Sequence, residues 1–416
     1  MLSPIPSGPP IALLLTGGGA RAAYQVGVLE AIAHIRRECG QAMGPNPFPI
    51  IAGTSAGAIN ASALACGADQ FESTVKLMAH TWRHFHAQQV YLADHFSMLR
   101  TGARWLTLLS LGWAVAKWRR VKPKSLLDNT PLHQLLGTLV PLERIPLLLR
   151  RGHLRALAVT ASSYSTGEHI TFYQSRSPIE AWVRSQRRAV AGTITHAHLL
   201  ASSAIPFVFP AMPLDMQGHT EYFGDGSMRQ SAPISPAIHL GAEKVLVVGA
   251  GRMHEPKDEL HLHSSDQYPS IAQIAGHALS NIFLDALAVD VERVRRINQT
   301  ISLVPPEKRH ASNLRPIDLL VIAPSQRLDA VAARHIDALP PAVRTLLGGM
   351  GVSSAKADRK GSALASYLLF ESAFTTDLMS LGYSDAMAQH DEICRFFGWE
   401  KPQHTTLADS DDTQAA

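Results

Sequence analysis

The sequence has few cysteines and no long hydrophobic segment. Its three cysteines, Cys39, Cys66 and Cys394, are scattered and odd in number, so they indicate neither a disulfide framework nor a metal knuckle. They favour a reducing compartment. The longest uncharged apolar run, Trp105–Ala116, falls short of the roughly 20 residues that a membrane-spanning helix needs. We therefore expect a cytoplasmic protein with no segment that crosses a membrane.

An excess of either charge is also absent. The chain carries 38 Lys and Arg against 34 Asp and Glu, a formal net charge of +4, so general attraction to nucleic acid is not indicated. The N-terminus lacks a basic region, and Ile11–Leu15 is too short for the apolar core of a signal peptide. No acidic loop has the spacing of calcium ligands, and we expect no metal and no cofactor.

Two successive segments have the pattern of a buried strand, a glycine-containing loop and a helix. Ile11–Thr16 is an apolar run closed by three glycines, and Ala22–Arg37 follows with apolar residues at helical spacing. Pro49–Ala52 is a second apolar run, and small helix formers occupy Ala58–Ala68 after the next loop. Repeated units of this kind predict an α/β fold with a largely parallel sheet.

The second loop, Gly53-Thr54-Ser55-Ala56-Gly57, matches the G-x-S-x-G pattern of a nucleophile elbow. Such a turn exposes the serine hydroxyl beside the amides of a helix N-terminus. Gly53 and Gly57 are expected because the turn needs strained backbone and close packing of strand on helix. Ser55 is thus a candidate nucleophile, although the five-residue pattern alone is a weak signal.

The first loop has three interpretations. It can be a tight turn that lets a helix pack on a strand. It can hold a phosphate, because Gly17-x-Gly19-x-x-Ala22 fits the loose dinucleotide pattern and Glu38 lies near the expected distance for a ribose carboxylate. It can also form an oxyanion hole, in which backbone amides point at the charge that develops on a carbonyl oxygen. A nearby candidate nucleophile, Ser55, favours the oxyanion hole.

A candidate acid lies much later in the chain. Glu221–Asp225 predicts a short strand, and Gly224 and Gly226 on either side of Asp225 leave this carboxylate accessible. A plain turn is the alternative. A Ser-His-Asp triad also stays open, because several histidines follow the acid: His239, His254, His261, His263 and His277.

A stretch rich in tryptophan and basic residues predicts a membrane contact. Trp105, Trp113 and Trp118 lie in or just after the apolar run, and five cations follow within eight residues: Lys117, Arg119, Arg120, Lys122 and Lys124. Tryptophan beside cations suits a membrane interface. A core helix followed by a solvated basic loop fits equally well.

The remaining sequence completes the predicted organisation. Further strands are expected at Leu154–Ala161, Ile170–Tyr173, Lys244–Gly249 and Ile317–Ala323, and a long helix over Ser270–Asn298. We divide the chain into a leader (1–10), a main domain (11–325) with a helical insertion at about 70–135, a helical C-terminal extension (326–401) and a disordered tail (402–416).

Three pieces in this order resemble the patatin-like phospholipase family: the glycine loop with Arg21, the Ser55 elbow, and Asp225-Gly226. The resemblance extends over roughly residues 11–251, with looser similarity to about residue 325. Two positions depart from the family pattern, since Ala22 replaces the last glycine of the oxyanion loop and Ser227 replaces a small residue. These departures concern fine geometry rather than the chemistry.

The resemblance implies a three-layer α/β/α fold with a mainly parallel sheet and a Ser–Asp dyad. Ser55 would be the nucleophile and Asp225 the general base. An oxyanion hole would be formed by the loop residues Gly17, Gly18, Gly19 and Arg21. The implied protein is a serine lipid acyl hydrolase of phospholipids or lysophospholipids that works through an acyl-enzyme. The tryptophan-rich and basic stretch would bring this cytoplasmic protein to the inner face of the membrane. A soluble carboxylesterase or acyltransferase and a non-catalytic nucleotide-binding module stay open as alternatives.

Overall fold

The computed structural model describes residues 8–92, 125–228, 230–253, 274, 276–278, 286–309, 314–349 and 362–399. Its strands are β1 (Ile11–Leu15), β2 (Ile50–Thr54), β3 (Ala156–Ser163), β4 (His169–Ser175), β5 (Val183–Arg184), β6 (Arg187–Ala191), β7 (Met212–Asp215), β8 (Thr220–Asp225), β9 (Lys244–Val248) and β10 (Asp318–Ile322). These ten described strands form one sheet in the order β10-β9-β1-β2-β3-β4-β6-β5, and the β7–β8 hairpin joins it at β3.

The centre of the sheet is parallel, and its register brings the two sequence motifs together. Strands β10, β9, β1, β2 and β3 run in one direction. Leu15, the last residue of β1, pairs with Gly53 near the end of β2. The glycine loop and the Ser55 elbow therefore leave the sheet at the same edge.

The candidate acid reaches this edge from the opposite direction. Thr54 of β2 pairs with Thr160 of β3, and the next residue, Ala161, pairs with Asp225 of the antiparallel strand β8. Two strand pairings thus bring the end of β8 beside the start of the elbow. Ser55 and Asp225 are 170 positions apart in the sequence, which carries no local sign of this pairing.

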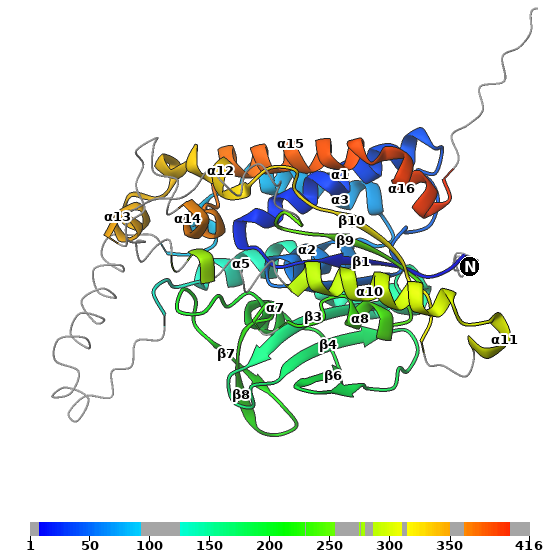
Figure 1. The fold of residues 1–416 in the computed structure, drawn as a ribbon. Coiled ribbons are helices and arrows are strands. Elements are labelled where there is room, and N and C mark those ends of the chain that lie inside the picture. The colour runs from blue at the N-terminus through cyan, green and yellow to red at the C-terminus, as the bar shows by residue number, and fades with distance from the viewer. Residues whose placement is uncertain are drawn as a thin grey trace, which may run out of the picture.

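Helices cover both faces of the sheet (Figure 1). The longer ones are α1 (Ala23–Glu38), α2 (Ala56–Cys66), α3 (Phe71–Arg83), α5 (Thr130–Leu139), α10 (Ala286–Ser302), α13 (Pro341–Gly349), α15 (Ser372–Ala388) and α16 (His390–Phe397). The shorter ones are α6 (Ile145–Arg151), α7 (His196–Ser202), α8 (Ser235–His239), α11 (Pro306–Arg309), α12 (Leu328–Ala333) and α14 (Ser362–Leu368), and a 3₁₀ turn covers Gly19–Ala22.

The side chains of β1 alternate between the two cores. Leu13 and Leu15 pack with α1, α2, α3, α15 and α16, whereas Ala12 and Leu14 pack with α8 and α10 on the other face. Figure 1 shows these two helical layers on opposite sides of the strands. The predicted three-layer α/β/α fold with a mainly parallel sheet and additional C-terminal helices is confirmed.

The predicted elements differ from the structure in two places. Strands β5, β6 and β7 were not predicted, because they lie toward the outside of the sheet and lack an apolar run; in β6, only Ala189 is buried. The helix predicted over Ser270–Asn298 extends to Ser302, and of its first half only 274 and 276–278 are described, as helical. None of the described helices is long and apolar enough to span a membrane.

Candidate active site

Ser55 occupies a strained turn between β2 and α2. Its backbone has φ 56° and ψ −134°, a region that non-glycine residues rarely adopt and that costs about 1–3 kcal/mol. Gly57, in the first turn of α2, lies so close to the carbonyls of Leu15 and Thr16 that a Cβ atom would overlap them. The G-x-S-x-G sequence therefore forms a sharp turn pressed against the end of β1, beside the glycine loop.

Ser202, at the end of α7, ties the elbow to its neighbours. The Ser55 amide donates a 2.8 Å hydrogen bond to Ser202 Oγ, which in turn donates to the Thr160 carbonyl at 2.6 Å. The amides of Asp225 and Gly226 donate to the carbonyls of residues 204 and 202, both at 3.0 Å. One short segment thus holds both halves of the candidate site. Ser202 was assigned no role from the sequence, because its partners Ser55 and Thr160 are far away in sequence.

Asp225 lies in direct hydrogen-bonding contact with Ser55. Ser55 Oγ donates to Asp225 Oδ2 at 2.5 Å, and the Ser227 amide donates to Oδ1 at 2.8 Å. The carboxyl group is fully buried. Burial raises its pKa to about 6, although the hydrogen bonds from Ser55 and Ser227 act in the opposite direction.

His169 supports the turn that follows Asp225. Its Nε2–H donates a 2.8 Å hydrogen bond to the Gly226 carbonyl, and burial lowers the pKa of this imidazole to about 4, so it is neutral at pH 7. Gly226 has no room for a side chain, because a Cβ would overlap the Thr160 carbonyl. Within the part of the chain that the structure describes, no histidine is hydrogen-bonded to Ser55 Oγ or to the Asp225 carboxylate.

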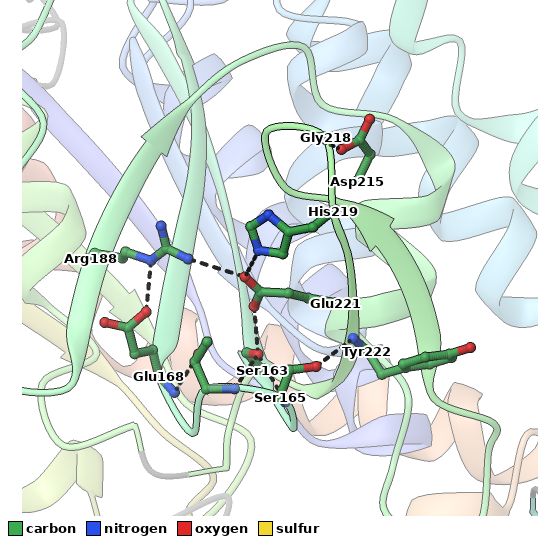
Figure 2. Close-up of polar contacts among 10 residues, drawn as sticks. Ser163, Ser165, Glu168, Arg188, Asp215, Gly218, His219, Glu221 and Tyr222 are labelled. Carbon is green, nitrogen blue, oxygen red and sulfur yellow. Dashed lines mark hydrogen bonds and ion pairs between the residues drawn. The ribbon is translucent and has the colours of Figure 1, made fainter.

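A polar cluster fixes the start of the strand that carries Asp225 (Figure 2). Glu221 of β8 is only 2% exposed and accepts a 2.8 Å hydrogen bond from Ser163 Oγ. Its other oxygen lies 3.0 Å from His219 Nε2 and 3.6 Å from Arg188. Burial by itself raises the pKa of Glu221, but these hydrogen bonds and the Arg188 charge lower it overall. The cluster anchors β8 to β3 and β6. No sequence pattern indicates this cluster, since its members come from three separate segments.

The glycine loop packs against the C-terminal part of the chain. Gly19 has φ +56°, and a Cβ there would overlap the Tyr367 carbonyl. The Arg21 guanidinium lies 4.1 Å from the centre of the Tyr367 ring, and its Nε donates to Ser366 Oγ at 2.8 Å. Arg21 thus contacts α14 and attaches the glycine loop to this helix. Among the described residues, none accepts a hydrogen bond from the amides of Gly17 and Gly18.

A family model supplies the assignment. The model described as patatin-like phospholipase matches residues 13–238, more than half of the chain. The chain belongs to the patatin-like phospholipase family. It is therefore a lipid hydrolase, which accords with a serine and a carboxylate placed together at the edge of the sheet.

Solved structures can be aligned with most of this patatin-like chain, but with low similarity. VipD from Legionella pneumophila shares 13% identity and a TM-score of 0.30, with 94% of this chain and 67% of VipD covered. The ExoU–SpcU complex of the Pseudomonas aeruginosa type III secretion system gives 15% identity and a TM-score of 0.26, with coverage of 92% and 75%. No curated protein sequence matches the chain.

An apolar cavity of about 100 Å³ opens beside the patatin-like elbow. Ser55 and Gly19 lie in its wall. The rest of the lining is mainly apolar and comes from α2, α3, α5, the segments that follow α3 and α7, and the segment between α14 and α15: Ala56, Ile59, Ala63, Leu77, Met78, Trp82, Phe85, Leu132, Leu135, Leu136, Leu139, Ile205, Phe209 and Phe370. Such a wall can take a hydrocarbon chain whose ester carbonyl is at Ser55.

The predicted membrane contact is not tested by the structure. Trp105, Trp113, Trp118, Arg119 and Arg120 all lie outside the described residues. Two large apolar side chains near the cavity are exposed, namely Leu77 in its wall and Phe207, which lies between the lining residues Ile205 and Phe209.

Proposed function

We propose that the protein is a serine lipid acyl hydrolase in which Ser55 and Asp225 form a catalytic dyad. The observation that carries the proposal is the 2.5 Å hydrogen bond from Ser55 Oγ to Asp225 Oδ2. A nucleophile needs a base within hydrogen-bonding reach, and Asp225 meets this requirement directly, without a histidine between the two residues. The strained backbone at Ser55 is a second support, since such strain is concentrated at functional sites.

In the proposed reaction, Ser55 Oγ attacks the ester carbonyl while Asp225 accepts the hydroxyl proton. The oxyanion that forms accepts hydrogen bonds from the amides of the glycine loop, Gly17–Gly19. When the tetrahedral intermediate collapses, Asp225 returns the proton to the leaving alcohol and the acyl group stays on Ser55. Asp225 then activates a water molecule, which attacks the acyl-enzyme and releases the fatty acid.

The raised pKa of Asp225 favours this role. An aspartate with an ordinary pKa near 3.9 is a weak base for an alcohol, whereas burial raises that of Asp225 to about 6. The carboxylate is still ionised at pH 7 and has a stronger tendency to take a proton. Much of the acceleration must nevertheless come from the loop amides, because one oxyanion donor is typically worth about 10²–10³ in rate.

The cavity supports a lipid as the acyl donor. A fatty-acyl chain would lie along α2, α3 and α5 with its carbonyl at Ser55, and burial of each methylene contributes about 0.8 kcal/mol. The family description, patatin-like phospholipase, favours phospholipids within this class. A soluble carboxylesterase would have the same dyad but little preference for long acyl chains.

A nucleotide-binding role for the glycine loop has less support. Glu38, the candidate ribose carboxylate, is the last residue of the 16-residue helix α1, which starts directly after the loop. At 1.5 Å per residue, α1 separates Glu38 from the loop by about 24 Å. Glu38 lies instead 3.4 Å from both His34 and His390.

Fluorophosphonate labelling, combined with fatty-acid release from phospholipid vesicles and from a short-chain ester, tests the proposal. We expect label on the wild type, none on Ser55→Ala, and hydrolysis lost in both Ser55→Ala and Asp225→Asn. Ser62→Ala is the matched control. Ser62 is a buried serine on α2, the helix that follows Ser55, and its side chain does not line the cavity.

The outcomes separate the alternatives. A ratio of vesicle to ester hydrolysis well above one supports the lipid hydrolase, and a low ratio supports the carboxylesterase. A folded wild type that takes no label, or a Ser55→Ala variant that keeps full activity, would overturn the dyad. Saturable adenine-nucleotide binding by the unlabelled protein would then support the nucleotide-binding module.

A further inference from the structure

Two of the three cysteines meet on the face of the molecule that α16 covers. Cys39 follows the last residue of α1, and Cys394 lies in the middle of α16. Their sulfur atoms are 3.7 Å apart although 355 positions separate them in sequence. A disulfide has sulfur atoms about 2.05 Å apart, so both residues are thiols here and need only a small shift to form one. Cys66, the third cysteine, lies elsewhere on α2.

The surroundings of Cys394 suit thiol chemistry. Cys394 is half-buried, whereas Cys39 is 3% exposed, so a reagent reaches Cys394 first. His390 lies one helical turn before it, with ring nitrogens 3.9 and 4.0 Å from the sulfur, and can accept the thiol proton. Glu38 Oε2 lies 3.4 Å from His390 Nε2, and Asp391 Oδ1 lies 2.9 Å from its Nδ1, so the ring lies between two carboxylates. The thiolate is the form of cysteine that reacts with disulfides.

We propose that Cys39 and Cys394 are a reversible disulfide site that responds to a small-molecule disulfide such as oxidised glutathione. The Cys394 thiolate attacks one sulfur of glutathione disulfide, which forms a mixed disulfide and releases one glutathione. The Cys39 thiolate then attacks Cys394 Sγ and releases the second glutathione. Overall, two protein thiols and one glutathione disulfide give one protein disulfide and two glutathione thiols.

The bond would fasten the C-terminal helices to α1. Residues 362–399 include Ser366 and Tyr367, which contact Arg21 and Gly19 of the glycine loop. A cross-link between positions so far apart in sequence strongly restricts the unfolded chain. Oxidation should therefore stabilise the protein and the attachment of this segment, and it does so whether or not Ser55 is catalytic.

The test is oxidation of the purified, reduced, full-length protein with excess glutathione disulfide at low protein concentration. Iodoacetamide then blocks remaining thiols, and peptides are mapped without reductant. We expect one cross-linked peptide pair, containing Cys39 and Cys394, and an alkylated Cys66. The thiol count under denaturing conditions should fall from three to one, and dithiothreitol should restore it.

Variants and stability measurements complete the design. Cys66→Ser should lose both of its remaining thiols on oxidation, whereas Cys39→Ser and Cys394→Ser should form no internal disulfide. The urea midpoint should rise on oxidation of the wild type and of Cys66→Ser, and stay unchanged in Cys394→Ser. Full alkylation of the oxidised wild type, a mixed disulfide that persists on Cys394, or a cross-link through Cys66 would each overturn the proposal. The wild-type peptide map decides the matter even if a serine variant fails to fold.

Discussion

The buried carboxylate of Asp225 should reduce the stability of the folded protein at neutral pH. Folding moves this group from water into a fully buried position and raises its pKa from 3.8 to about 6. At roughly 1.4 kcal/mol per pKa unit, the ionised side chain costs the folded state about 3 kcal/mol above pH 6. Asp225→Asn keeps the shape and removes the charge, so we expect the variant to be more stable than the wild type at pH 8.

The sign of the pH dependence follows from the direction of the change in pKa. The folded state binds the proton more tightly than the unfolded state, so the wild type loses stability as the pH rises from about 4 to 6 and changes no further above. The free energy of unfolding of Asp225→Asn, relative to the wild type, should therefore increase by about 2 kcal/mol between pH 4 and pH 8. Hydrogen bonds that the substitution alters shift the difference in free energy of unfolding by the same amount at every pH, so they do not affect its increase between pH 4 and pH 8.

Urea denaturation followed by circular dichroism at several pH values measures the difference directly. Asp337→Asn is the control, because the Asp337 side chain is 79% exposed and its charge is not buried on folding. The reasoning is refuted if the difference in free energy of unfolding between Asp225→Asn and the wild type does not vary with pH. It is also refuted if the wild type becomes the more stable of the two as the pH rises.

Two further predictions concern catalysis. The proposed base must be ionised, so kcat/KM for a neutral ester should fall about tenfold per pH unit below about 6, and a flat profile between pH 5 and 8 would contradict the assignment of Asp225. Gly19→Ala should lower hydrolysis by about 10²–10³, because the new methyl group would overlap the Tyr367 carbonyl and displace the oxyanion loop. Gly40→Ala is the control, because Gly40 has a similar φ of +68° but open space around it. This variant should lose about 1 kcal/mol of stability and keep its hydrolysis rate. Equal losses of hydrolysis in the two variants would contradict the role of the loop.

The departures from the family pattern have simple structural consequences. Ala22 lies at the end of the 3₁₀ turn and is fully buried at the start of α1, where a methyl group fits. Ser227 holds Asp225 through its backbone amide, a contact that any residue except proline can make. Neither substitution disturbs the hydrogen bond between Ser55 and Asp225.

The sequence by itself determined the local elements of this protein. The apolar runs predicted β1 and β2, and the glycines predicted the sharp turns after them. Both signals are local, because a few neighbouring residues determine whether a segment can form a buried strand and whether the backbone can turn sharply. The G-x-S-x-G pattern singled out Ser55 for the same reason. Asp225 was a candidate from its flanking glycines and from the order of the motifs.

Only the tertiary structure decided which distant groups meet. The contact between Ser55 and Asp225 depends on the antiparallel pairing of β8 with β3, and the supporting contacts of Ser202 and His169 depend on the packing of α7 and β4. The close approach of Cys39 and Cys394 likewise requires α16 to fold back onto α1. Contacts across hundreds of residues follow from strand order and helix packing, which no periodicity within a single segment records.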